Sequence, residues 1–352
     1  MKKPFVAMLL LAIGIMLVVY WGCQNLFAQA EPPYDDDQEG LNDQIVFKFS
    51  HVVAENTPKG QAAAKFAELV DEKSNGTIQI VVFPNGSLYS DIEEINALKD
   101  EQVHMIAPST SKLGMLSAQW GVLDLPFAFP DYEAITKGVH GPIGEKLLQS
   151  LQKEGIKGLA QWPNGFKQIT TNKGPVIEPE DLSGQNFRIM QSEIIQAQFS
   201  LLGAIAQQES FNSTFNLIEE GKVDGEENTI SNIYSRKFYT VQKHMTITNH
   251  GYLGYAVMMN QNVWDRQSEK TQQILLEAMK ETTVWNDENA RRLNREQLAL
   301  IKENSSIQIH ELSQAEKKQW MDRLEPLYEE YGEIIGEELM ENLKELRESY
   351  QE

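Results

Sequence analysis

The stretch from Ser268 to about Glu303 contains neither glycine nor proline. Apolar residues such as Ile274 and Trp285 recur in it at multiples of three to four residues, as on one face of an α-helix. Thirty-six helical residues rise by about 54 Å, which exceeds the ~30 Å diameter of a small lobe. The sequence therefore predicts one helix that lies along two lobes, or alternatively two helices with a break near residues 286–289.

Length and composition agree with a chain of two lobes. The protein has 352 residues, enough for two lobes of roughly 150 residues each. Hydrophobic residues make up 41% and aromatic residues 9%, which is a globular composition with material for packed cores. We expect residues 44–164 plus about 254–285 in the first lobe, and residues 165–253 plus about 286–345 in the second.

The first half of the chain alternates between strand and helix patterns, which predicts βαβ units and a largely parallel sheet in an α/β fold. Strands are expected at 45–52, 77–83, 103–107 and 157–162, and helices at 57–74, 91–101 and 143–153. The sequence Pro163-Asn164-Gly165 is typical of a turn, and we place the first lobe crossing there.

The alternation restarts after this turn. Strands are expected at 167–171, 186–190, 245–249 and 255–260, helices at 192–202 and 211–220, and a tight acidic turn at 223–228. A last helical region begins at Ser313, because Ser313 and Glu316 form the pattern of a capping box.

The N-terminus differs from the rest of the chain. Lys2 and Lys3 precede an uncharged apolar run from Phe5 to Trp21, and the segment 31–43 is acidic and reads as a linker. Cleavage after Ala30 would release the protein, processing at Cys23 would leave a lipid anchor, and an uncleaved run would stay in the membrane. All three place the protein outside the cytoplasm, either in the periplasm or tethered to the outer face of the membrane.

Composition also excludes several classes of function. A formal net charge of −20 disfavours nucleic acid as a partner. Cys23 is the only cysteine, so neither an internal disulfide nor a cysteine-based zinc site is available. The six histidines lack metal-ligand spacing, and no nucleophile elbow, P-loop or dinucleotide fingerprint occurs, so we expect no enzyme, metal or cofactor. Acidic pairs such as Glu93-Glu94 and Glu226-Glu227 are common in so acidic a chain and do not indicate a catalytic site.

Four residues in the second half are candidates for binding an acid. Arg188 lies in an apolar strand, and its planar guanidinium matches a carboxylate; the alternative is a surface arginine with an acidic neighbour. Lys167 could take a second carboxylate, or remain solvated. Asn228 could contact the ligand or stabilise its own turn. Phe211 could cover the ligand or fill the core.

Seven runs of sequence resemble the DctP-type solute-binding proteins of TRAP transporters, in the same order and with matching spacing. They cover residues 49–60, 83–88, 106–109, 125–127, 162–168, 187–192 and 223–228. The similarity extends over about residues 45 to 345 and fits the C4-dicarboxylate branch of the family best. It implies a two-lobed, periplasmic-binding-protein-like α/β fold with a hinge and a long helix spanning both lobes.

The resemblance also implies roles for individual residues. Arg188 matches the arginine that binds the ligand carboxylate, Asn228 the asparagine that supports it, and Phe211 an aromatic residue beside it. Lys167 matches a cationic position that contacts the ligand in many members. Positions in the first lobe that match residues facing the cleft are His51, Tyr89, Ser109 and Lys59.

The function that follows is capture of succinate, fumarate or malate and its delivery to the membrane subunits of a TRAP permease. The alternative is a ligand-binding co-sensor that docks on the extracytoplasmic domain of a sensor kinase. The sequence of this chain does not separate the two.

Overall fold

A computed structural model describes residues 44–350 of the chain. The expected signal peptide or anchor and the acidic linker lie outside these residues. No helix among the described residues is both long and apolar enough to cross a membrane.

The described strands form one mixed sheet. They are β1 (Ile45–Ser50), β2 (Ile78–Phe83), β3 (Met105–Ile106), β4 (Ile156–Thr171), β5 (Asn186–Ile189), β6 (Ile205–Gln208), β7 (Gly225–Thr229), β8 (His244–Asn260) and β9 (Gln308–Glu311). Their order is β2-β1-β3-β8-β4-β7-β5-β6, and β9 pairs with β8. Pairs within the β2-β1-β3 group and within the β7-β5-β6 group are parallel, as predicted, whereas β8 and β4 join the two groups through antiparallel pairs.

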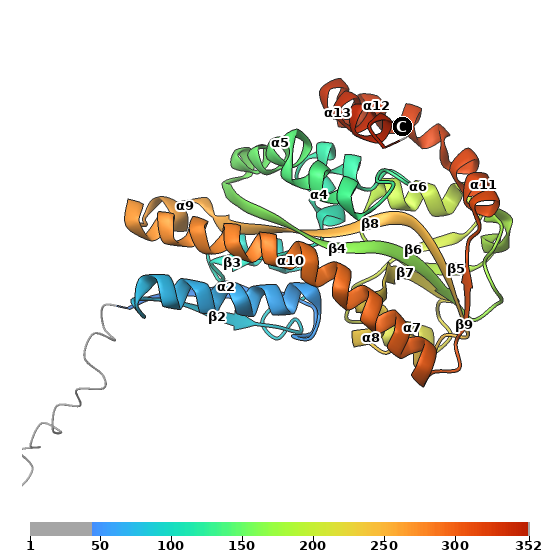
Figure 1. Cartoon of the computed structure of the whole chain (residues 1–352), viewed down its shortest axis with the longest axis horizontal. Coiled ribbons are helices and arrows are strands. Elements are labelled where there is room, and N and C mark those ends of the chain that lie inside the picture. The colour runs from blue at the N-terminus through green and yellow to red at the C-terminus, as the bar shows by residue number, and fades with distance from the viewer. Residues whose placement is uncertain (1–43, 351–352) are drawn as a thin grey trace, which may run out of the picture. The chain divides into compact units, whose positions relative to one another are not determined.

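Helices cover the sheet and follow the expected alternation (Figure 1). The α-helices are α2 (Pro58–Ser74), α3 (Glu94–Lys99), α4 (Tyr132–His140), α5 (Pro142–Ser150), α6 (Glu193–Leu201), α7 (Thr214–Glu219), α8 (Ile230–Ser235), α9 (Gln261–Asp265), α10 (Glu269–Asn304), α11 (Gln314–Leu324), α12 (Pro326–Ile335) and α13 (Glu337–Glu348). Short 3-10 helices are η3 (Thr110–Met115), η4 (Ala118–Leu123), η5 (Leu151–Glu154), η6 (Pro179–Leu182) and η7 (Phe238–Thr240).

Local sequence determines where several helices begin. The Thr57 hydroxyl accepts a hydrogen bond from the Gly60 N–H (3.1 Å), and Pro58 follows at the first helical position of α2. The capping box predicted at Ser313 is present at the start of α11, where Ser313 and Glu316 each bond the other's backbone N–H. Helices α3 and α7 are shorter than predicted, because residues before each of them form a non-helical turn.

The predicted turn at residues 163–165 is wrong, because the chain continues through it as the 16-residue strand β4. Pairing with the 17-residue strand β8 shifts register between Pro163 and Gly165, which is a β-bulge, and Gly165 has a φ of 153°. Side chains of a neighbouring helix donate hydrogen bonds to two backbone carbonyls at the bulge. Asn286 donates to the Pro163 carbonyl (3.0 Å), and Asn294 donates to the Asn164 carbonyl (2.8 Å).

These two asparagines belong to α10, which is one continuous helix of 36 residues, as predicted. The alternative break near residues 286–289 does not occur. Asparagine is a weak helix former, and here the side chains of both asparagines bond the strand beneath. Figure 1 shows α10 crossing the molecule, and it contacts α2 from the first half of the chain and α8 from the second. The helix and the β4–β8 pair thus connect both groups of strands.

The predicted acidic turn at residues 223–228 is also wrong for most of its length, because β7 occupies it from Gly225. Strand β7 is buried throughout, and it carries Glu226, Glu227 and Asn228. Successive side chains of a strand point to opposite faces of the sheet. The two glutamates therefore enter two different environments, which matters for the site described next.

Candidate ligand-binding site

A small cavity of about 30 Å³ lies between residues from the two halves of the chain. Its wall combines side chains from residues 52–112 with others from residues 188–255. The lining residues are Val52, Val53, Lys59, Asp91, Glu94, Ser109, Lys112, Arg188, Met190, Phe211, Asn228, Asn232, Leu253 and Tyr255. The cavity has room for a water molecule or two, so a larger ligand requires the walls to separate.

Arg188 lies in the cavity wall on β5 and is 1% exposed. Its Nε and Nη2 both donate to the carbonyl oxygen of Glu209, at 3.0 and 2.9 Å. These bonds hold the guanidinium plane, and within the described residues its Nη1 has no hydrogen-bond partner. An oriented, buried N–H group without a partner is a strong donor for an anion.

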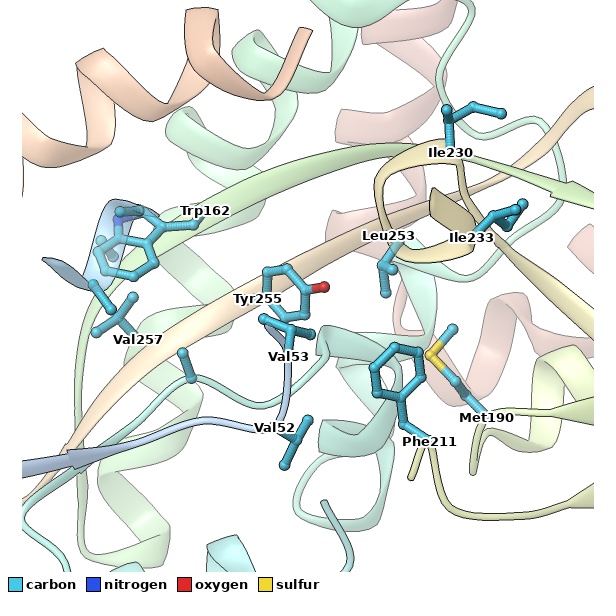
Figure 2. Packing of buried hydrophobic residues seen from close by; sticks show 14 of the residues in the cluster. Val52, Val53, Trp162, Met190, Phe211, Ile230, Ile233, Leu253, Tyr255 and Val257 are labelled. Carbon is cyan, nitrogen blue, oxygen red and sulfur yellow. The ribbon is translucent and has the colours of Figure 1, made fainter. Parts of the chain in front are cut away.

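Asn228 and Phe211 also line the cavity from the second half of the chain. The Asn228 Nδ2 donates to Glu226 Oε2 (3.1 Å), and its Oδ1 accepts from Asn232 Nδ2 (2.8 Å). Phe211 packs its ring against the Arg236 guanidinium, 4.7 Å from the ring centroid. Figure 2 shows Phe211 and Met190 approaching from one side, with Val53 and Tyr255 across from them.

Lys59 and Ser109 bring polar groups from the first half of the chain. The Lys59 ammonium is 1% exposed, donates to the Ala107 carbonyl (2.8 Å) and lies 3.9 Å from the centroid of the Tyr255 ring. Burial lowers the pKa of Lys59 to about 8, although Glu94 and Asp91 nearby oppose this. The Ser109 hydroxyl contacts the Met190 sulfur at 3.4 Å. Both predicted residues therefore lie in the wall.

Three charged residues in the wall were not predicted. Lys112 on η3 forms a buried ion pair with Asp91 and also donates to its carbonyl oxygen (2.7 Å). Asp91 in turn accepts from the Phe211 backbone N–H (3.3 Å), which joins the two sides of the cavity. Glu94, at the start of α3, is fully buried. The chain is rich in acidic residues and lysines, so nothing in the sequence distinguishes these three as cavity residues. Only their position relative to the strand ends could have indicated that they line the cavity.

His51 and Tyr89 do not line the cavity. His51 follows β1 directly and is completely buried, while its neighbours Val52 and Val53 form the wall. Burial, assisted by the nearby Lys59, lowers the pKa of His51 to about 3, so the imidazole is neutral at physiological pH. Tyr89 is half-buried and packs against the apolar cluster beneath α4 and α5. The geometry does not favour direct ligand contact by either residue.

Lys167 lies on the opposite face of the sheet from Asn228. In the β4–β7 pair Lys167 opposes Thr229, and Gln168 opposes Asn228, so Lys167 and Asn228 point to different faces. The Lys167 ammonium forms a buried ion pair with Glu227 (3.1 Å). Glu227 also lies 3.2 Å from the His250 Nε2. Lys167 is therefore part of a buried ionic network behind the sheet, which is at odds with the prediction that it contacts the ligand.

A larger groove of about 430 Å³ adjoins the other side of Lys112, between η3, η4 and α12. The charged residues that line it are Lys112, Asp124 and Glu193, so acidic groups outnumber the single cation. Asp124 is already bonded to the hydroxyls of Ser111 (2.6 Å) and Ser192 (2.7 Å). The smaller cavity, which gathers Arg188, Lys59 and Lys112, is the better candidate for binding an anion.

Comparison with known proteins shows the family of this chain. The sequence model of bacterial extracellular solute-binding protein family 7, the DctP family, matches residues 49–334. The chain belongs to this family. The C4-dicarboxylate-binding protein DctB of Bacillus subtilis (strain 168) is 61% identical over 347 residues, which cover 99% of each chain. The C4-dicarboxylate-binding periplasmic protein DctP of Rhodobacter capsulatus is 42% identical over 86% of this chain and 91% of its own.

Solved structures of TRAP periplasmic solute-binding proteins share the fold. A TRAP periplasmic solute-binding protein from Shewanella oneidensis with bound succinate has a TM-score of 0.84 and 39% identity, covering 86% of this chain and 99% of its own. One from Pseudomonas aeruginosa PAO1 with bound L-malate has a TM-score of 0.79 and 36% identity, covering 82% and 100%. The predicted two-lobed α/β fold with a lobe-spanning helix is confirmed.

Proposed function

We propose that this family-7 protein captures a C4-dicarboxylate, such as succinate, fumarate or malate, in the cavity around Arg188. The observation that carries the proposal is the gathering of three buried cations, Arg188, Lys59 and Lys112, around one enclosed space. The solved relatives with bound succinate and L-malate support the same ligand class. A surface with a net charge of −20 does not attract such a ligand, so local cations must supply the attraction.

The two carboxylates of the ligand would bind at opposite ends of the cavity. One pairs with the partnerless Nη1 of Arg188, beside Asn228, and the other meets Lys59, Lys112 and the Ser109 hydroxyl. The apolar side chains of the wall, including Phe211 and Met190, cover the carbon chain between them. We leave Lys167 out of this set because Glu227 already pairs its ammonium on the other face of the sheet.

Closure of two lobes around the ligand supplies the affinity. We place the lobes at residues 44–164 plus about 254–285 and 165–253 plus about 286–345, with β4, β8 and α10 crossing between them. Lys59 and Lys112 then belong to one lobe, and Arg188 and Asn228 to the other. Closing excludes water and strengthens both ion pairs, because charges interact more strongly at low dielectric.

Calorimetric titration of residues 31–352 with succinate, fumarate and malate should give micromolar dissociation constants, or about −8 kcal/mol. A monocarboxylate of the same chain length is the control and should bind at least tenfold more weakly, because one end of the cavity then lacks its anion. Products should not appear on prolonged incubation, since the family is one of solute-binding proteins. Absence of binding to all three diacids would exclude the proposed ligand class.

The second part of the proposal is delivery to the membrane subunits of a TRAP permease by a protein exported through its N-terminal segment. The names of the relatives describe binding proteins and do not support the alternative co-sensor role. Deleting the gene should abolish uptake of labelled succinate, and the gene lacking codons 5–21 should not restore it, because the protein then stays in the cytoplasm. Normal uptake in the deletion strain, together with a lost transcriptional response to succinate, would instead indicate the co-sensor.

A further inference from the structure

Glu94 has an unusual position for a carboxylate in a site that binds anions. It is the first residue of α3, its side chain lines the cavity, and it is 0% exposed. Neither of its carboxylate oxygens has a hydrogen-bond partner among the described residues. Buried polar groups nearly always have partners, so these two oxygens point to an interaction that forms only with a ligand or a proton.

The charged groups around Glu94 come from several elements. Lys59 on α2 and Lys112 on η3 are its cationic neighbours, Asp91 precedes it on the chain, and the Tyr255 phenol faces it from β8. Arg188 completes the cations of the wall from β5. Glu226 lies behind Arg188 on β7, outside the wall, and both of its oxygens accept hydrogen bonds, from Thr170 (3.0 Å) and Asn228 (3.1 Å).

The charges of the wall do not balance those of a dicarboxylate. Three cations, Lys59, Lys112 and Arg188, stand against the carboxylates of Asp91 and Glu94, which leaves one net positive charge. A ligand with two carboxylates would make the closed cavity negative, and an ionised Glu226 would make it more so. An uncompensated charge in a closed cavity is strongly unfavourable. A single proton on Glu94 makes the summed charge of these five wall residues and the ligand zero.

We propose, building on the proposed function, that Glu94 takes up a proton when the dicarboxylate binds and donates it as a hydrogen bond to the ligand. Each dianion that binds to a protein with an ionised Glu94 then brings one proton into the site. Glu94 becomes a specificity-determining donor in place of a repelling anion. The hydrogen bond also gives a partner to one of the two Glu94 oxygens that otherwise lack one.

In the cavity as the structure shows it, without ligand, the carboxyl of Glu94 already favours the protonated form more than a carboxyl in water does. Burial raises the pKa of Glu94 to about 7, although Lys59 and Lys112 oppose the shift. A dianion beside it raises this pKa further, since like charges favour the protonated form. Below pH 7 Glu94 is protonated before the ligand arrives, and above pH 7 it must gain a proton on binding. Affinity therefore falls as pH rises, by about threefold between pH 6.5 and 7.5 for one such group.

The test is the number of protons taken up per succinate, from calorimetry at pH 7.5 in two buffers with different ionisation enthalpies. Wild type should take up between about one half and one proton, following the fraction of Glu94 that is ionised at that pH. Glu94→Gln keeps the shape and a donor, so it should still bind succinate while losing most of the uptake and of the pH dependence. The control, Glu93→Gln, alters the exposed neighbour on the same turn and should match wild type.

Binding by wild type without proton uptake would overturn the inference and leave the dicarboxylate function intact, whereas no binding of succinate at any pH would remove the proposed function itself. Unchanged uptake in Glu94→Gln would also overturn it, because the proton then resides on Glu226, Lys59 or the ligand. If Glu94→Gln does not fold, Glu226→Gln shows which carboxylate takes up the proton. Proton uptake that persists in this variant, together with a new carboxylic-acid infrared band on succinate binding, supports Glu94. Loss of the uptake assigns the proton to Glu226.

Discussion

Replacing Arg188 by alanine should weaken succinate binding by about 30-fold to several thousand-fold, the equivalent of ~2–5 kcal/mol. The guanidinium is held by two hydrogen bonds to the Glu209 carbonyl, so its free Nη1 pays little entropy when it meets a carboxylate. Removing it also leaves one carboxylate of the ligand buried without its main partner. Titration calorimetry on the purified variant measures the loss.

Two further variants test whether the loss of affinity is due to the guanidinium of Arg188. Arg188→Lys retains the charge but not the planar fork, and it should recover only part of the affinity. Arg266→Ala removes an exposed arginine that pairs with Glu101, and it should bind succinate as wild type does. Wild-type affinity in a folded Arg188→Ala protein would show that the ligand binds elsewhere.

Replacing Lys167 by methionine should lower the free energy of unfolding by ~3–5 kcal/mol, because Glu227 would remain buried without its main counter-ion. The affinity of the folded variant for succinate should change by less than about threefold, since Lys167 lies on the opposite face of the sheet from the cavity. Urea unfolding and calorimetry together separate these two effects.

The same pair predicts how stability depends on pH. Burial acts to raise the pKa of Glu227, but Lys167 and His250 outweigh it and lower the pKa to about 2. This carboxylate therefore contributes stability above its unfolded pKa of about 4.5, and the contribution is lost as pH falls from about 5 towards 2. The double variant Lys167→Met/Glu227→Gln should lack this loss and recover part of the stability of the single variant.

An ion pair on the surface provides the control for the stability effect of Lys167→Met. Lys65→Met breaks an exposed ion pair with Glu68 and should change stability by less than about 1 kcal/mol. A Lys167→Met protein of normal stability that no longer binds succinate would contradict the structural role and restore the role that the resemblance implied for this lysine.

Pattern-based reasoning succeeded where local sequence decides structure. The start of α11 follows from Ser313 and Glu316, and the continuity of α10 follows from the absence of glycine and proline over its length. It failed at residues 163–165, where proline and glycine suggested a turn. That strand continues because it pairs with β8 on both sides of the bulge, where Asn286 and Asn294, more than a hundred residues away, bond the carbonyls.

For the candidate site, the sequence identified Arg188, Asn228, Phe211, Ser109 and Lys59 as residues that the structure brings to one cavity. It placed Lys167, His51 and Tyr89 there as well, and the structure does not. Ligand contact by these three residues therefore remains a prediction that the geometry does not favour. His51 and Val52 are adjacent in sequence, but only Val52 reaches the cavity wall.

By itself, the sequence determined the family, the α/β class and the lobe-spanning helix, and it pointed to Arg188, which lines the candidate cavity, because each depends on residue identity and spacing along the chain. Only the tertiary structure decided which charges share the cavity. Glu93 and Glu94 look equivalent in the sequence, yet one is exposed and the other faces Lys59 and Lys112. Such differences depend on which face of a strand or helix is covered, and that depends on contacts between distant segments.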